Sequence, residues 1–352
     1  IYPKTDAEAF AIASFAPWPA HVFGPVYQKE GAEGIKKMWT LNEDPAKIVS
    51  AGPWVVESYR PGERVVLKRN PYLDRYEIRI VKDVNAALAE FLAGNIDIFN
   101  PSTVDHISQI RQAVQQGRLD ATIKVNASPV ASSQFMVFNW NKASDPFKQS
   151  LFRSDKFRRA MSHLVNRQAV IDIVYGGLGT PMYSSVYPVL TQWINPKVPK
   201  YEYDPKQAAK LLAELGFTKK DREGYLVDSK GRRIEFNLAT NAGNTQREQI
   251  AKLIVDEAKK VGVKVNFQAI DFNTLVGQLL SSGPDRPFDA IIIGLTGGGL
   301  DWPFGSNVVP CKGNLHMWNK SGQCLDPRET LMEKLYYQGR TELDFKKRVE
   351  IG

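Results

Sequence analysis

The sequence lacks long apolar runs and dense clusters of positive charge. No stretch of 18 or more apolar residues occurs among its 352 residues, so it predicts no membrane-spanning helix. The 46 lysines and arginines are spread among 38 aspartates and glutamates, in pairs such as Arg158-Arg159 and not in tracts. The net charge of +8 therefore indicates a solvated surface of mixed sign and argues against nucleic-acid binding.

Motifs of the common enzyme and nucleotide-binding classes are also missing. The chain has no G-x-S-x-G nucleophile turn and no H-E-x-x-H pair, and its four histidines lie far apart in the sequence. The glycine-rich stretch 294–304, GLTGGGLDWPF, lacks the G-x-G-x-x-G spacing, and no lysine follows its glycines as in a phosphate-binding loop. The sequence therefore predicts a protein that is not an enzyme and carries no cofactor.

Only two cysteines are present, Cys311 and Cys324, at the two ends of the segment CKGNLHMWNKSGQC. Structural zinc sites draw on three or four cysteine and histidine ligands, and His316 alone stands between these two. A local disulfide needs only the two thiols and is typical of exported proteins. The sequence favours the disulfide and an exported location, and it predicts no metal site.

Hydrophobic patterns of strand and helix type alternate along the chain. Residues 52–72 alternate apolar and polar side chains on either side of Pro61-Gly62, which predicts a β-hairpin. Residues 76–99 have the pattern of a strand, a helix and a strand, which predicts a βαβ unit. Thr245 and Glu248 form a capping-box pattern for a later helix. Because 352 residues suffice for two domains, we expect an α/β fold of two parts.

The glycine stretch follows a predicted buried strand, residues 288–294. Ligand clefts of α/β domains form at the carboxyl ends of such strands. Several tryptophans, Trp140 and Trp302 among them, lie in or next to loops at strand ends. These features predict a binding cleft without a reaction centre.

Four segments, in order, resemble the extracellular solute-binding proteins of ABC transporters, family 5, which includes dipeptide- and oligopeptide-binding proteins. They are KDVNAALAEFLAGNIDIF; FMVFNW with DKFRRAMSHLVNRQAVIDIVYGG; YDPKQAAKLLAELGF; and IAKLIVDEAKKVGVKVNFQAIDFNTLVGQLLSSGPDRPFDAIIIG. The resemblance covers about residues 50 to 350 and implies a two-lobed, periplasmic-binding-protein-like α/β fold of type II. Residues 1–131 would belong to the first lobe, 132–140 would form the crossing strand, and 141–352 the second lobe. It also implies that N-terminal and C-terminal segments of the fold are missing.

The resemblance implies a function as well. The protein would be the periplasmic or extracellular solute-binding component of an ABC importer, which captures di- or oligopeptides and delivers them to membrane permease subunits. It would be a monomer, associated with the membrane through the permease or a lipid anchor outside this chain. Two alternatives stay open, namely a receptor for a sugar or metal chelate and a hydrolase that uses the cleft between the lobes.

Peptide-binding relatives carry an acid, in the loop after the last strand, that pairs with the α-ammonium group of the peptide. By the resemblance this position is Gly298, so the acid is absent, and Asp301 is the nearest replacement. A turn before Trp302 would explain Asp301 equally well. The resemblance also implies a local disulfide between Cys311 and Cys324. The predicted ligand-binding residues are Asp301, Trp302, Thr296, Gly297, Gly298, Asn241, Asn139 and Trp140.

Overall fold

The computed structural model describes residues 20–36, 38, 54–60, 63–70, 73–101, 103–124, 132–296 and 307–352. The chain divides into two compact units, residues 1–82 and residues 83–352. This division does not test the predicted lobes, whose boundaries stay a prediction.

The first unit contains a three-stranded antiparallel sheet. β1 (Val55–Arg60) pairs with β2 (Arg64–Asn70), and β2 pairs with β3 (Leu73–Arg79). The predicted hairpin is therefore confirmed. A helix of the same unit, α2 (Ala20–Lys36), is bent at Gly31, where a φ of 63° suits a residue without a side chain.

The predicted βαβ unit is wrong. β3 is the third strand of the antiparallel sheet, and residues 96–99 are described but form no strand. Ile96 and Phe99 pack instead on the apolar cluster formed by α3 (Val84–Leu92) and α4 (Val104–Gln115). A short apolar run can either pair in a sheet or cover helices, and periodicity alone does not separate the two uses.

The second unit is built on a four-stranded sheet with the order β4-β9-β7-β8. Its strands are β4 (Ser132–Phe138), β7 (Glu235–Asn241), β8 (Lys264–Ile270) and β9 (Ala290–Thr296). β7 is parallel to β8 and β9, whereas β4 is antiparallel to β9. The carboxyl ends of the three parallel strands and the amino end of β4 therefore lie together. We call this end of the sheet, with Ser132, Asn241 and Thr296, the open end, and the other, with Phe138 and Ala290, the closed end.

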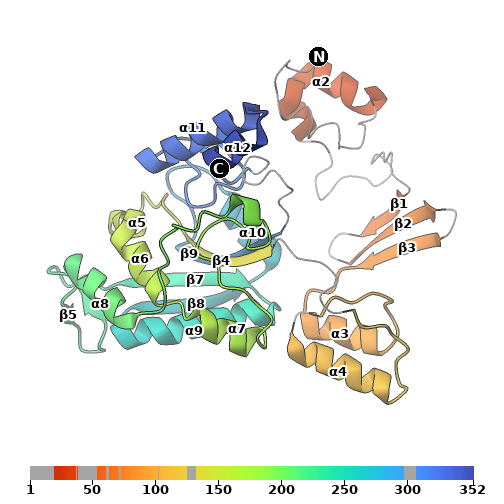
Figure 1. Cartoon of the computed structure of the whole chain (residues 1–352), viewed down its shortest axis with the longest axis horizontal. Coiled ribbons are helices and arrows are strands. Elements are labelled where there is room, and N and C mark those ends of the chain that lie inside the picture. The colour runs from red at the N-terminus through yellow and green to blue at the C-terminus, as the bar shows by residue number, and fades with distance from the viewer. Residues whose placement is uncertain are drawn as a thin grey trace. The chain divides into compact units, whose positions relative to one another are not determined.

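Helices cover both faces of this sheet (Figure 1). On one face, α6 (Asp155–His163), α8 (Pro205–Glu214) and α9 (Thr245–Val261) pack around a group of phenylalanines in which Phe138 and Phe236 meet edge to face. On the other face, α10 (Phe272–Leu280) packs against β4, β7 and β9. The central strand β9 is consequently buried on both sides, which explains its continuous apolar sequence.

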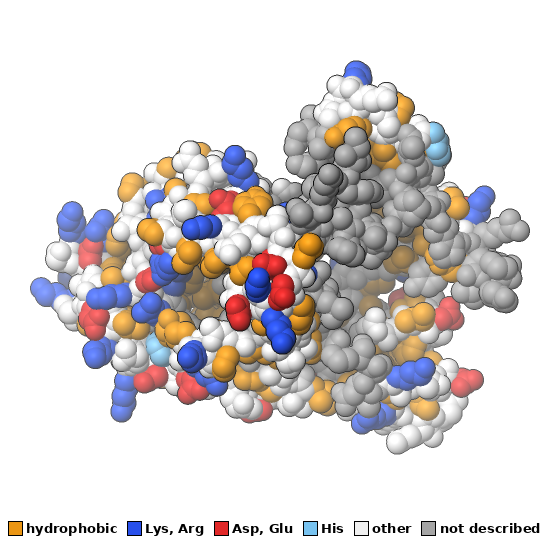
Figure 2. All heavy atoms as spheres, turned by 45° about the horizontal axis from the view of Figure 1, so that its top comes forward, with side chains coloured by type: hydrophobic (Ala, Val, Ile, Leu, Met, Phe, Trp, Pro, Cys, Tyr) orange, Lys and Arg blue, Asp and Glu red, His pale blue; other side chains and the backbone are white. Residues whose placement is uncertain are grey.

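The remaining described elements of the second unit surround this core. They are α5 (Pro146–Arg153), α7 (Arg167–Val174), η2 (Thr191–Trp193), β5 (Lys219–Lys220), β6 (Leu226–Val227), α11 (Pro327–Thr341) and α12 (Phe345–Ile351). In the parts of the chain that the structure describes, no helix combines the length and apolarity that a membrane span needs. On the face shown in Figure 2, basic and acidic side chains lie among one another.

Polar caps determine where several helices begin. The N-cap of α9 is Asn244, whose side chain accepts a hydrogen bond from the backbone N–H of Arg247 at 3.0 Å. The predicted capping box on Thr245 is therefore displaced by one residue, and Glu248 reaches back to the N–H of Gly243 at 3.0 Å. Asparagine and threonine are both good N-caps, so the local sequence did not distinguish them.

Candidate ligand-binding site

The second unit contains a cavity of about 1400 Å³ beside β4. All seven residues of β4, from Ser132 to Phe138, line it. Successive side chains of a strand point to opposite faces, so a cavity that meets all seven must run along the edge of the strand. β4 is an edge strand, since β9 is its only partner among the described strands. The backbone N–H and C=O groups that face away from β9 therefore point along the cavity.

The other walls of the cavity are largely apolar. α6, α7 and α9 contribute Met161, Val170, Ile171, Ile250 and Ile254. The loop after α7 adds Leu178 and Val189, which are 66% and 39% exposed. Leu178 is therefore largely exposed and Val189 partly so, and both add apolar surface to the cavity wall.

At the open end of the sheet, Arg247 is a cation that pairs with no carboxylate among the described residues. Its guanidinium donates to Gln134 Oε1 at 2.8 Å and to Asn241 Oδ1 at 2.7 Å. Burial lowers the pKa of Arg247, and the neighbouring Tyr175 opposes this effect. Gln134 and Tyr175 line the cavity, whereas Arg247 and Asn241 are not among its lining residues. The guanidinium therefore lies next to residues of the cavity wall and has no carboxylate partner among the described residues.

A second group of charges lining the cavity is paired. Arg158 bonds to Asp155, and its guanidinium lies 4.7 Å from the centre of the Trp140 ring. Arg328 bridges Asp155 and Asp326, and its hydrogen bonds hold the pKa of Asp326 at about 2. Arg158 and Arg328 thus have carboxylate partners, whereas Arg167, which also lines the cavity, donates to backbone oxygens and to the Ser162 hydroxyl.

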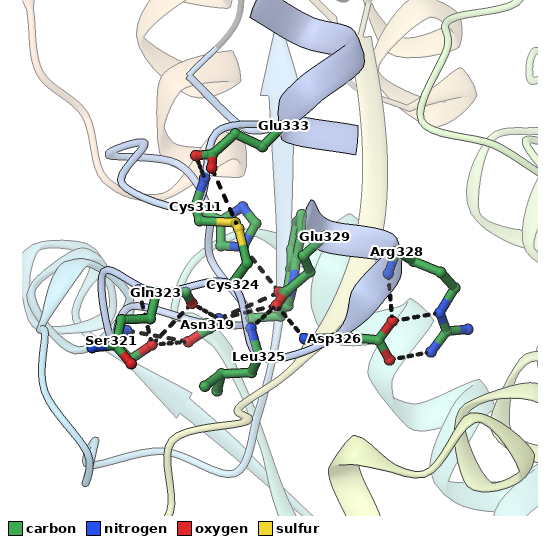
Figure 3. The surroundings of a disulfide bond; sticks show 12 residues. Cys311, Asn319, Ser321, Gln323, Cys324, Leu325, Asp326, Arg328, Glu329 and Glu333 are labelled. Carbon is green, nitrogen blue, oxygen red and sulfur yellow. Dashed lines mark hydrogen bonds and ion pairs between the residues drawn. A yellow bond between two sulfur atoms is a disulfide. The ribbon is translucent and has the colours of Figure 1, made fainter. Parts of the chain in front are cut away.

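The predicted disulfide is confirmed. Cys311 and Cys324 are joined, with their Cα atoms 5.3 Å apart (Figure 3). The bond closes a loop whose Leu315, Met317 and Trp318 line the cavity. The cross-link therefore restrains part of the cavity wall.

The structure places the predicted ligand residues in different surroundings. Trp140 lines the cavity. Asn241 and Thr296 lie at the open end, where Asn241 holds Arg247 and the Thr296 hydroxyl is 3.3 Å from that of Ser132. Asp301, Trp302, Gly297 and Gly298 lie outside the described residues. The ligand roles of all these residues stay predictions.

Asn139 lies at the closed end of the sheet and is fully buried. Its side-chain amide donates to the backbone carbonyls of Arg286 and Phe288 at 3.2 and 2.7 Å. Its side-chain oxygen accepts from the N–H of Asn141 at 2.9 Å. These bonds explain why an asparagine is needed there for the fold, while its ligand role stays a prediction.

Sequence reasoning missed Arg247, Gln134 and Tyr175. Gln134 and Arg247 are 113 positions apart, so no local motif could have joined them. One signal was available, because Arg247 lies in the first turn of a predicted helix. The helix dipole disfavours a cation at that position, which hints at another reason for its presence.

Comparisons with known proteins agree with this architecture. Residues 2–313 match the model of the bacterial extracellular solute-binding proteins, family 5 Middle. A probable ABC transporter-binding protein of Deinococcus radiodurans is 48% identical over 378 residues, which cover 100% of this chain and 63% of that protein. The oligopeptide-binding protein AppA of Bacillus subtilis is 30% identical over 296 residues, which cover 81% of this chain and 49% of AppA.

The solved structure of Bacillus subtilis AppA in complex with a nonapeptide has a similar fold. Its TM-score is 0.76 at 24% identity, and the match covers 99% of this chain and 65% of that one. The expected mixed α/β fold of the periplasmic binding proteins is thereby confirmed. This chain spans about half to two thirds of the length of the relatives that it matches.

Proposed function

This chain belongs to the bacterial extracellular solute-binding proteins of family 5, and from that membership we propose that it captures di- or oligopeptides for an ABC importer. In this role it binds the peptide in the periplasm or at the outer surface and passes it to the permease subunits without chemical change. It acts as a monomer that reaches the membrane through the permease or a lipid anchor. The lobes predicted at 1–131 and 141–352 close around the ligand, with 132–140 as the crossing strand.

The observation that carries the peptide assignment is the edge of β4 along the cavity. An extended peptide adds to such an edge through main-chain hydrogen bonds, which do not depend on the side chains of the ligand. A sugar would need polar side chains around each hydroxyl group; the lining includes Ser162, Arg167 and Gln246, but the wall formed by Met161, Ile250 and Ile254 is apolar. The edge and the apolar walls therefore favour an extended peptide with apolar side chains.

Arg247 supports a ligand with a negative group at the open end. Gln134 and Asn241 orient its guanidinium, and the described residues supply no carboxylate to neutralise it. A planar guanidinium binds a carboxylate through two parallel hydrogen bonds. Every unmodified peptide has a terminal carboxylate, so Arg247 is our candidate for its partner.

The edge-addition proposal is tested with N-methylated peptides. Peptides that copurify with the protein are identified by mass spectrometry, and one is resynthesised with a single backbone N-methyl group at each position in turn. Only every second N–H of a strand bonds to a given neighbour. We expect affinity in calorimetry to fall about tenfold at alternate positions, with the intervening positions as matched controls.

Two results would contradict the proposal. Uniform tolerance of N-methylation would exclude addition to the edge of β4. Repeated recovery of a sugar or a metal chelate, with no peptide, would support the alternative of a non-peptide receptor.

A further inference from the structure

The Cys311–Cys324 disulfide is packed against carboxylates of α11. The N–H of Cys311 donates to Glu333 Oε1 at 2.9 Å, and Cys324 Sγ lies 3.5 Å from Glu333 Oε2. Figure 3 shows Glu329 and Glu333, one turn apart on this helix, both directed toward the disulfide loop. Folding thus brings the disulfide sulfurs close to carboxylate oxygens of residues that lie further along the sequence.

His316 and Glu329 face each other in the buried surroundings of the disulfide. His316 is fully buried, and its Nδ1 lies 2.9 Å from the backbone oxygen of Val308. A carbonyl only accepts, so Nδ1 carries a hydrogen. Nε2 then lies 3.0 Å from Glu329 Oε1. A neutral imidazole would turn its lone pair toward a carboxylate oxygen here, and either a proton or a metal ion removes that repulsion.

The sulfur of Cys311 completes a set of metal-ligand atoms. Cys311 Sγ, a ring nitrogen of His316 and a carboxylate oxygen of Glu329 lie within 4.8 Å of one another, and all three residues are buried. The two sulfurs and a carboxylate oxygen of Glu333 form a second such group. Thiolate, imidazole and carboxylate are the ligands that zinc takes in proteins.

The surroundings hold these ligands in a fixed orientation. Glu329 also accepts hydrogen bonds from Trp318 Nε1 and from the N–H of Leu325, each at 2.6 Å. Burial alone would raise the pKa of Glu329, but the bonds from His316, Leu325 and Trp318 outweigh it and lower the pKa. A histidine that donates its second N–H to a backbone carbonyl, as His316 does to Val308, has the usual orientation of a metal ligand.

We propose that the disulfide and a zinc ion are alternative cross-links of this one site. A dithiol reductant passes two electrons to the Cys311–Cys324 bond, becomes a disulfide itself and leaves two thiols. Zinc then binds both sulfurs as thiolates, Nε2 of His316 and the carboxylate of Glu329. The two thiol protons and the proton between His316 and Glu329 pass to solvent. The loop that carries Met317 and Trp318 to the cavity therefore stays closed in both redox states.

Cobalt(II) is the probe for this site because thiolate-bound tetrahedral cobalt absorbs visibly. The protein is reduced with a dithiol, separated from it under nitrogen and titrated with cobalt(II). We expect the reduced protein to bind one cobalt ion per chain with thiolate charge-transfer absorption, the oxidised protein to bind none, and zinc to displace the cobalt. His316→Gln keeps both thiols but should weaken binding at least about tenfold.

His163→Gln is the matched control, because His163 bonds to a backbone oxygen near the surface and should leave cobalt binding unchanged. Circular dichroism establishes whether each reduced variant is folded. The proposal is overturned if the folded, reduced protein binds no cobalt, or if His316→Gln binds it as tightly as the wild type. If reduction unfolds the protein, zinc must restore its spectrum, and failure to do so also overturns the proposal.

Discussion

The second unit holds two charges at opposite ends of its sheet, Asp289 and Arg247, in different ways. At the closed end, Asp289 is 3% exposed and pairs with Lys142 at 3.3 Å and with Lys148 at 2.7 Å. At the open end, Arg247 is held by amide oxygens alone and meets no carboxylate among the described residues. The fold itself supplies the countercharges of Asp289. The buried Arg286 near the closed end, however, donates to the backbone oxygens of Met317 and Leu279 and has no carboxylate partner among the described residues. The contrast therefore concerns Asp289 and Arg247, and Arg247 is our candidate for a charge that meets a ligand.

The first prediction removes the ion pairs of Asp289 at the closed end and has the largest expected effect. Asp289→Asn leaves Lys142 and Lys148 without a carboxylate in a mostly buried place. We expect the free energy of unfolding to fall by about 3 kcal/mol, measured by urea denaturation. Asp172→Asn is the control, because Asp172 is exposed and bonds only to Gln168 among the described residues, and it should change stability little. Equal stability of the two variants would show that the closed end does not depend on this pairing.

The second prediction acts on the open end. Arg247→Gln removes the cation proposed to meet the ligand carboxylate, and we expect affinity for a peptide with a free carboxylate to fall by about 2 kcal/mol in calorimetry. The unfolding free energy should change by less than about 1 kcal/mol, because only hydrogen bonds to neutral amides are lost.

Arg222→Gln, at an exposed arginine, is the matched control for Arg247→Gln. A peptide amide, which lacks the terminal carboxylate, should bind both variants and the wild type alike. If Arg247→Gln lowers stability without lowering affinity, Arg247 stabilises the fold as Asp289 does and does not bind the ligand. The two charges would then have the same role.

The third prediction concerns the opposite end of the peptide. If Asp301 pairs with the ligand ammonium, Asp301→Asn should weaken binding by on the order of 1–3 kcal/mol for peptides with a free amino terminus. N-acetylated peptides should bind the wild type and the variant equally. Unchanged calorimetric affinity for the free peptide would remove Asp301 from the site and leave Arg247 as the candidate anchor.

The smallest expected effect is a pH dependence at the closed end. Burial would raise the pKa of Asp289, but the hydrogen bond and charge of Lys148, the N–H of Asn237 and the charge of Lys142 together lower it. A carboxyl group whose pKa is lowered by folding adds stability above its unfolded pKa of about 4 and loses it as the pH falls further. Wild-type stability should therefore fall more steeply below about pH 4 than that of Asp289→Asn, as followed by urea denaturation. Parallel curves would contradict the lowered pKa.

Local sequence signals predicted single elements well. The alternating pattern of residues 52–72 predicted a hairpin, and β1 and β2 pair there in antiparallel fashion. The N-cap of α9 is Asn244, one residue before the predicted cap Thr245, because both residue types suit that role. Residues 96–99 were wrongly predicted as a strand, because their apolar side chains pack on helices.

The candidate site could be predicted only in part. Trp140 was chosen as a tryptophan next to the end of a strand, and it does line the cavity. Asp289 was a carboxylate at the start of a predicted strand, and nothing in the local sequence indicated that two lysines more than 140 positions away would pair with it. Pairs of this kind depend on how strands are ordered in the sheet, and one sequence does not show that order.

The sequence by itself determined the family, the alternation of helices and strands and the two cysteines that form the disulfide. These features follow from the order of segments and from periodicities along the chain, and neither depends on how the elements pack in the tertiary structure. Only the tertiary structure decided that the cavity follows the edge of β4, that Arg247 meets amide oxygens and no carboxylate among the described residues, and that Glu329 meets His316 beside the disulfide. The physical reason is that charge pairing, ligand sets and cavities depend on distances between atoms, and folding sets those distances by joining residues that the chain keeps apart.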